Sequence, residues 1–142
     1  MIKRSKANIQ DSSPMYGFDP KIGFWGLKKL NHKAYFDYEI ENPIDVYHNS
    51  EGLREDDFKK SNKGSIICCG GSHTWGAGIK QNKRYSDLLK GKQPFDVVNM
   101  GHCSLGLDQV ILSIIGKTKM YKPRIIIIEQ YTWALHRVIT KY

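Results

Sequence analysis

The sequence predicts an α/β domain with three layers, α/β/α, around a short parallel sheet, and three apolar segments carry this prediction. Residues 65–69, 95–99 and 124–129 have the composition of strands, and a segment of helical pattern lies between each pair. Strands that are joined through helices in this way are parallel, and their right-handed crossovers place helices on both faces of the sheet. The chain of 142 residues is long enough for one domain with its own core.

The chain divides into three regions by composition. Residues 1–13 are polar and basic and are expected to form a flexible tail. Residues 14–63 are rich in aromatic side chains but are interrupted by glycine and proline, which predicts an irregular segment laid over the core, with one short strand near 34–40 and a helical turn at 55–60. Residues 64–142 are expected to form the regular α/β core.

Within the core, each element has its own signal. Residues 85–90 predict a short helix that stops at Gly91, and apolar residues at helical spacing predict a second helix over 107–119. The continuous apolar run 124–129 predicts a strand whose two faces are both covered. A further helix can begin within 130–142. Adjacent Cys68 and Cys69 alternate across the first strand and are interpreted as small buried hydrophobic residues.

The segment Gly70–Gly76 follows the first strand and presents a candidate nucleophile, Ser72. Glycines permit a sharp strand-to-helix turn, and the first N–H groups of the following helix have no partner within that helix. Such N–H groups can stabilise an oxyanion beside the serine. The alternative interpretation is that Ser72 is an ordinary helix N-cap.

These residues resemble the SGNH (GDSL-type) hydrolase superfamily. Gly70-Gly71-Ser72-His73-Thr74-Trp75-Gly76 is similar to its first sequence block, and residues 97–106 with Gln109 are similar to its second block. Residues 16–24 and 49–54 resemble the lead-in that precedes the first block. The resemblance implies a flavodoxin-like fold, ester hydrolysis or acyl transfer, Ser72 as the nucleophile and the backbone N–H of Ser104 as an oxyanion donor.

The sequence departs from the family pattern at the first block, the third block and the general base. Gly71 stands where the family has aspartate, and residues 129–133 lack the asparagine of the third block. No Asp-x-x-His follows, so the core is expected to be truncated relative to the family, with the base either a histidine beyond this sequence or His102. The other candidates for the base are His73, His136 and a dyad formed by Asp45 and His48. Cys103 is a candidate thiol nucleophile.

Two classes of function remain open from the sequence. One is a serine esterase or acyl-ester transferase that acts on a small-molecule or carbohydrate ester. The other is a non-catalytic carbohydrate- or protein-binding module that retains the fold without the chemistry. We expect neither cofactor nor metal, because the phosphate-loop and dinucleotide signatures are absent and Cys68, Cys69 and Cys103 lack metal-ligand spacing.

Charge and targeting signals set the remaining expectations. The net charge is +8, but the lysines are scattered and form no basic stripe, so nucleic-acid binding is not expected. Unpaired cysteines, no apolar signal segment and no run of membrane-spanning length predict a cytoplasmic protein. A sheet of three strands leaves an open edge, which predicts self-association or cover by the N-terminal segment.

Overall fold

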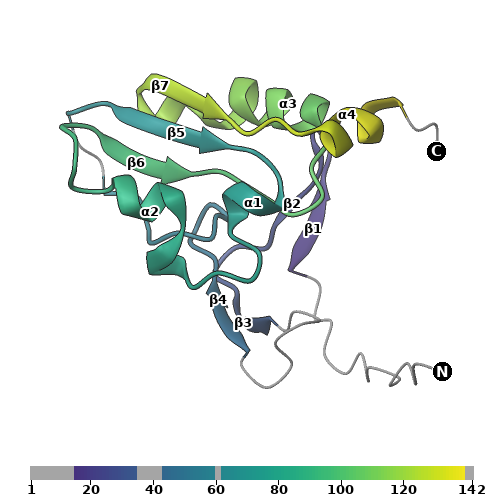
Figure 1. The fold of residues 1–142 in the computed structure, drawn as a ribbon, viewed down its shortest axis with the longest axis horizontal. Coiled ribbons are helices and arrows are strands. Elements are labelled where there is room, and N and C mark those ends of the chain that lie inside the picture. Colours follow the sequence, from purple (N-terminus) through teal and green to yellow (C-terminus); the bar gives the residue numbers. More distant parts are fainter. Residues whose placement is uncertain (1–14, 35–42, 60–61, 140–142) are drawn as a thin grey trace.

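Three parallel strands form the centre of the fold. The computed structural model describes residues 15–34, 43–59 and 62–139. Strand β5 (Ser65–Cys69) lies between β6 (Asp96–Asn99) and β7 (Pro123–Ile128), which gives the strand order β6-β5-β7 (Figure 1). Ile67 of β5 aligns with Val98 of β6 on one side and with Ile126 of β7 on the other. The predicted α/β class with a short parallel sheet is confirmed.

Helices lie on both faces of this sheet. The structure contains α1 (Ser72–Trp75), α2 (Tyr85–Leu89), α3 (Leu107–Lys117) and α4 (Thr132–Ile139), with short 3₁₀ turns η1 (Gln81–Lys83) and η2 (Lys119–Tyr121). Figure 1 shows α1 and α2 on one side of the strands and α3 on the other. The predicted helices at 85–90 and 107–119 are therefore confirmed, and a helix does begin within 130–142.

The two adjacent cysteines mark the two faces of the central strand. Cys69 belongs to a core cluster with Val110 of α3, whereas Cys68 belongs to a cluster with Leu89 of α2. Both cysteines are completely buried and neither forms a disulfide. Their interpretation as small buried hydrophobic residues is confirmed, because alternation along a strand directs consecutive side chains to opposite faces.

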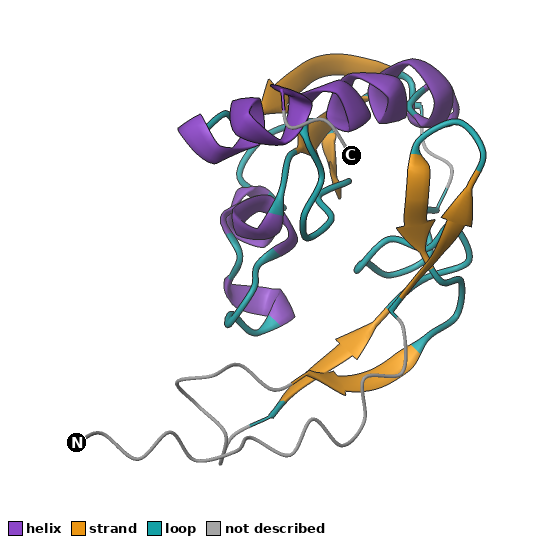
Figure 2. Cartoon of the chain, turned by 90° about the vertical axis from the view of Figure 1, so that its right-hand side faces the viewer, coloured by secondary structure: helices purple, strands orange, loops and turns teal. Residues whose placement is uncertain are grey.

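The N-terminal region contains two hairpins rather than the irregular segment predicted. Strand β1 (Tyr16–Asp19) pairs with β2 (Gly23–Gly26), and β3 (Asn31–Ala34) pairs with β4 (Ile44–Tyr47), both antiparallel and apart from the central sheet (Figures 1 and 2). The carboxylate of Asp19 accepts the backbone N–H groups of Lys21 and Ile22, which closes the first turn. Most of the strand expected near 34–40 lies outside the described residues.

The helical turn expected at 55–60 is wrong for the described residues 55–59, which form no helix. Glu55 is instead buried, and its carboxylate accepts the backbone N–H of Asn99 and contacts Lys90 and Arg84. A polar pattern indicated a solvent-exposed turn, but these cationic partners allow the carboxylate to be buried.

Strand β7 is exposed, contrary to the expectation that both its faces are covered. Its four isoleucines at 125–128 are between 38% and 45% exposed. In the described part of the chain β7 pairs only with β5, and the N-terminal strands pair with one another and do not cover this edge. An apolar run therefore indicated a strand correctly but not its depth in the fold.

Candidate functional site

Ser72 is the first residue of α1 and lies directly beyond the carboxyl end of the central strand. The turn consists of Gly70 and Gly71, and α1 has Gly71 as its N-cap, without a side-chain cap. The alternative interpretation of Ser72 as the N-cap residue therefore does not hold. The helix is a single turn that ends at Gly76, whose positive φ of 86° allows its N–H to bond to the Ser72 carbonyl.

Two glycines are required because backbone and side chains approach them closely. A Cβ atom at Gly70 would lie 2.5 Å from the Cβ of Glu129, and one at Gly101 would lie 2.7 Å from the carbonyl carbon of Thr74. Contacts this short do not occur between real carbon atoms. The loop after β6 therefore packs directly on α1.

Asn99 at the end of β6 fixes that loop to the serine turn. Its amide donates to the Thr74 carbonyl and to Ser86 Oγ, 2.7 Å away, while its Oδ1 accepts the Gly101 N–H at 2.9 Å. The backbone N–H of His102 also donates to the Gly70 carbonyl at 3.1 Å. The first and second sequence blocks therefore meet at one edge of the sheet.

Ser104 lies in this second loop with its side chain exposed and with φ of 68°. The left-handed region is one that residues with a Cβ adopt at a cost, and glycine adopts freely. Ser104 thus holds backbone angles that suit a glycine. Gln109 supports the loop by accepting the Gly106 N–H and donating to the Ile22 carbonyl at 2.7 Å.

His102 is buried, although the sequence suggested it as a base. Its ring stacks on Trp25 at 3.9 Å between centroids, and its Nε2 and Nδ1 lie 3.1 and 3.4 Å from the carbonyl oxygens of Gly52 and Met100. Burial lowers the pKa of His102 to about 4. Both ring nitrogens therefore face backbone carbonyl oxygens, and this geometry gives His102 a structural role.

Asp45 and His48 do not form the dyad that their spacing suggested. Asp45 is exposed on β4, whereas His48 is buried and its Nδ1 donates to the Leu27 carbonyl at 3.0 Å. Burial also lowers the pKa of His48. Cys103 is half-buried, and burial raises the pKa of its thiol, which disfavours the thiolate that a nucleophile requires.

Glu129 is the site residue that sequence reasoning missed. It follows β7, and its Oε2 accepts the backbone N–H of Thr74 at 2.7 Å and the Thr74 hydroxyl at 2.6 Å. Its Oε1 lies 3.0 Å from Nδ1 of His73, whose side chain is 74% exposed. The available signal was a carboxylate at the end of a strand whose neighbour ends in a glycine turn.

Aromatic and cationic side chains from the end of the chain approach the same edge. The Tyr131 ring packs against His73 at 5.3 Å, and its hydroxyl would lie 3.3 Å from a Cβ at Gly71. Arg137 of α4 donates to the Leu105 carbonyl at 3.2 Å and lies 5.9 Å from the Tyr131 ring. His136 is exposed on the same helix.

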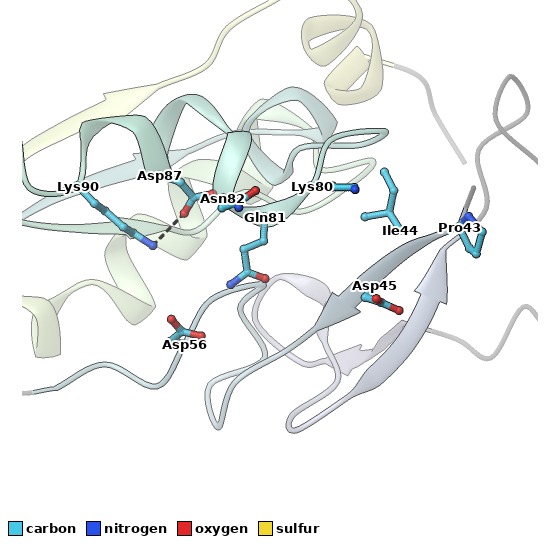
Figure 3. A pocket seen from close by; sticks show the side chains of 9 residues that line it. All are labelled: Pro43, Ile44, Asp45, Asp56, Lys80, Gln81, Asn82, Asp87 and Lys90. Carbon is cyan, nitrogen blue, oxygen red and sulfur yellow. Dashed lines mark hydrogen bonds and ion pairs between the residues drawn. The ribbon is translucent and has the colours of Figure 1, made fainter. Parts of the chain in front are cut away.

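A separate pocket of about 680 Å³ lies between β4 and the η1–α2 region (Figure 3). Its lining includes Asp45, Lys80 and Gln81, and the Lys90–Asp87 ion pair lies at one end. Ser72, Ser104 and Glu129 are not among the lining residues. The pocket is therefore distinct from the edge at which the two sequence blocks meet.

Among the described residues, no group of three histidine, cysteine, aspartate or glutamate side chains is placed to hold a metal ion. No helix in the described ranges is both long and apolar enough to cross a membrane. A comparison with protein-family models finds no match for this chain, and a comparison with curated protein sequences finds none either. The resemblance to SGNH hydrolases therefore rests on the residues of its motifs.

Proposed function

We propose that the chain is an SGNH-type serine ester hydrolase or acyl-ester transferase domain in which Ser72 is the nucleophile. The observation that carries the proposal is the position of Ser72, at the carboxyl end of the central strand and at the start of a helix. Ligands of open α/β sheets bind at such strand ends. The order β6-β5-β7, with the first core strand in the middle, is also the order with which a flavodoxin-like sheet begins.

The proposed chemistry uses the backbone at both loops. The Ser72 oxygen attacks the ester carbonyl carbon, and the N–H groups of Ser72 and Ser104 stabilise the oxyanion that forms. The ester C–O bond then breaks, and the alcohol leaves with a proton. Water, or a second alcohol in a transfer reaction, attacks the acyl-serine and regenerates Ser72.

The proton acceptor is to be sought among the exposed histidines. His48 and His102 are buried and bonded to backbone carbonyls, so they are poor acceptors at neutral pH. His73 and His136 are exposed, and the ring of His73 is already held by Glu129. A histidine that a carboxylate orients is the usual arrangement of a base in serine hydrolases.

Labelling with a fluorophosphonate probe tests the proposal. We expect the label on Ser72 alone, none in Ser72→Ala, and retained labelling in the matched control Ser104→Ala, which keeps its backbone N–H. Glutamine variants of His73 and His136 identify the base by a loss of labelling. Absence of label from a protein with a cooperative unfolding transition would reject Ser72 as an activated nucleophile in this chain.

The second candidate function is a non-catalytic module that binds a carbohydrate or a protein partner. One observation favours it: in the part of the chain that the structure describes, no hydrogen bond joins the Ser72 hydroxyl to a histidine ring. Tyr131 beside His73 provides an aromatic surface at the same edge. This candidate would be supported if the fluorophosphonate probe does not label the protein, the protein binds an oligosaccharide, and Tyr131→Ala loses that binding.

A further inference from the structure

We propose that Glu129, the residue after β7, is the N-terminal cap of α1, because Gly71 has no side chain that could serve as the cap, and that Glu129 thereby positions Ser72. The catalytic half of this inference rests on the proposed function. The structural half, that one carboxylate caps this turn, stands independently of any activity.

The turn needs a cap that its own sequence does not supply. The first N–H groups of a helix lack intrahelical partners, and the side chain of the N-cap residue normally accepts the N–H of the second or third helical residue. Here the N-cap is Gly71, which has no side chain. Thr74 is the third helical residue, so its N–H is one that an N-cap side chain would satisfy.

Glu129 satisfies this group from another part of the chain. One oxygen, Oε2, accepts both the N–H and the hydroxyl of Thr74, at 2.7 and 2.6 Å. The other oxygen faces His73 Nδ1 at 3.0 Å. The Glu129 N–H donates to the Cys69 carbonyl at 2.8 Å, so the backbone of Glu129 is bonded to the end of β5, the strand that leads into the serine turn.

The glycines provide the room that this arrangement requires. A Cβ at Gly70 would lie 2.5 Å from both the Cβ and Oε2 of Glu129. A Cβ at Gly71 would lie 3.8 Å from Oε1 of Glu129 and 3.3 Å from the Tyr131 hydroxyl, and Gly71 has φ of −86°. A side chain at position 71 therefore requires the Tyr131 hydroxyl to shift by a few tenths of an ångström, at a backbone ψ of −142°, whereas position 70 has no room for one.

This geometry gives a compensation test. Glu129→Ala removes the cap, and Gly71→Asp places a carboxylate where an N-cap residue can reach the Thr74 N–H. In the Glu129→Ala background, Gly71→Asp should raise the melting temperature. In the wild-type background the same substitution should lower it, because two carboxylates would compete for one N–H group. Glu129→Ala alone should lower the melting temperature by about 3–8 °C.

Fluorophosphonate labelling of Ser72, measured well below each melting temperature, separates positioning from stability. We expect Glu129→Ala to slow labelling about tenfold or more. The double variant Gly71→Asp/Glu129→Ala should recover the part of the rate that depends on the cap of α1, but not the part that depends on the contact of Glu129 with His73. The matched control is Asp57→Ala, which removes a carboxylate that accepts a backbone N–H, that of Ser50 at 2.8 Å, in an exposed loop; it should leave labelling unchanged.

Each outcome bears on one half of the inference. Wild-type labelling with no effect of Glu129→Ala, or no recovery in the double variant, overturns the positioning role. If the wild-type protein is not labelled, the proposed function fails, and the cap is judged from melting temperatures alone. A reversed sign of the Gly71→Asp effect between the two backgrounds supports the cap, and additive effects overturn it.

Discussion

The guanidinium of Arg54 lies 4.5 Å from the centre of the Trp75 ring and donates to the Gly76 carbonyl at 2.7 Å. It also donates to the Ile79 carbonyl at 2.9 Å, and its side chain is buried. The segment that precedes the core therefore holds the carboxyl end of α1, while Glu129 holds the amino end. The single helical turn that carries Ser72 is fixed at both ends by residues distant in sequence.

Arg54→Lys should destabilise the fold by about 2–3 kcal/mol, because lysine cannot reproduce the planar donor fork that serves several carbonyl oxygens. The check is urea unfolding followed by circular dichroism. Lys59→Ala, at an exposed position, is the control and should change stability by less than about 0.5 kcal/mol. Equal unfolding midpoints for Arg54→Lys and wild type would contradict the anchoring role.

The stability of the protein should fall as the pH is lowered from about 6.5 to about 4. Burial lowers the pKa of His102 to about 4, with smaller contributions from nearby His48 and Lys117. An unfolded histidine titrates at about 6.5, so in this window the unfolded state binds more protons and acid favours unfolding. The loss should approach about 3 kcal/mol.

Unfolding free energies at pH 7 and pH 4.5 measure this effect. His102→Gln should reduce the pH dependence, although it should also lower stability at pH 7, because the ring stacked on Trp25 is lost. His48 is also buried with a lowered pKa and should account for part of the remaining slope. If His102→Gln retains the whole pH dependence of the wild-type unfolding free energy, the assignment to His102 is contradicted.

Ser104→Gly should raise stability by about 0.5–1 kcal/mol, because the residue has φ of 68° and a Cβ is disfavoured there. The backbone N–H is kept, so fluorophosphonate labelling of Ser72 should continue. Ser104→Val, with a branched Cβ, should lower stability and is the contrasting variant. A destabilised Ser104→Gly protein would show that the serine hydroxyl has a structural role.

The sequence predicted the core well because its signals are local. Ile66 to Cys69 form an apolar run that ends at Gly70, and the spacing of Val110 and Ile114 is helical, so strand β5 and helix α3 followed directly. The turn at Asp19 also carried a local signal, an Asx turn followed by Gly23, from which the first hairpin could have been predicted.

The rest depended on contacts between residues far apart in the chain. The cap of α1 joins Thr74 to Glu129, and the burial of Glu55 depends on Lys90 and on Arg84. His102 was placed correctly in the loop after β6, but its burial depends on Trp25, which lies in the N-terminal hairpin. Spacing along the sequence does not report such packing.

The exposed edge of β7 predicts that two copies of the chain pair through it. Because the Glu129 N–H donates to β5, alternation directs the N–H groups of Ile128 and Ile126 outward. The register between β5 and β7 shifts between Ser65 and Ile66, so this alternation does not extend to Arg124. An antiparallel pair centred on Ile126 would satisfy the outward N–H group of Ile126 on both chains. The isoleucines of β7, at least 38% exposed, would gain cover at the same time.

Sedimentation velocity over a range of protein concentrations tests this pairing. Ile126→Lys places a charge at the centre of the edge and should shift the protein towards monomer. The matched control is Leu88→Lys, at an exposed position of α2, a helix that lies away from β7. This substitution should leave association unchanged. A wild-type protein that stays monomeric up to the highest concentration, or equal association of both variants, would contradict pairing through β7. If Ile126→Lys is monomeric and folded, its thermal stability should become independent of protein concentration, because association no longer contributes to the folded state.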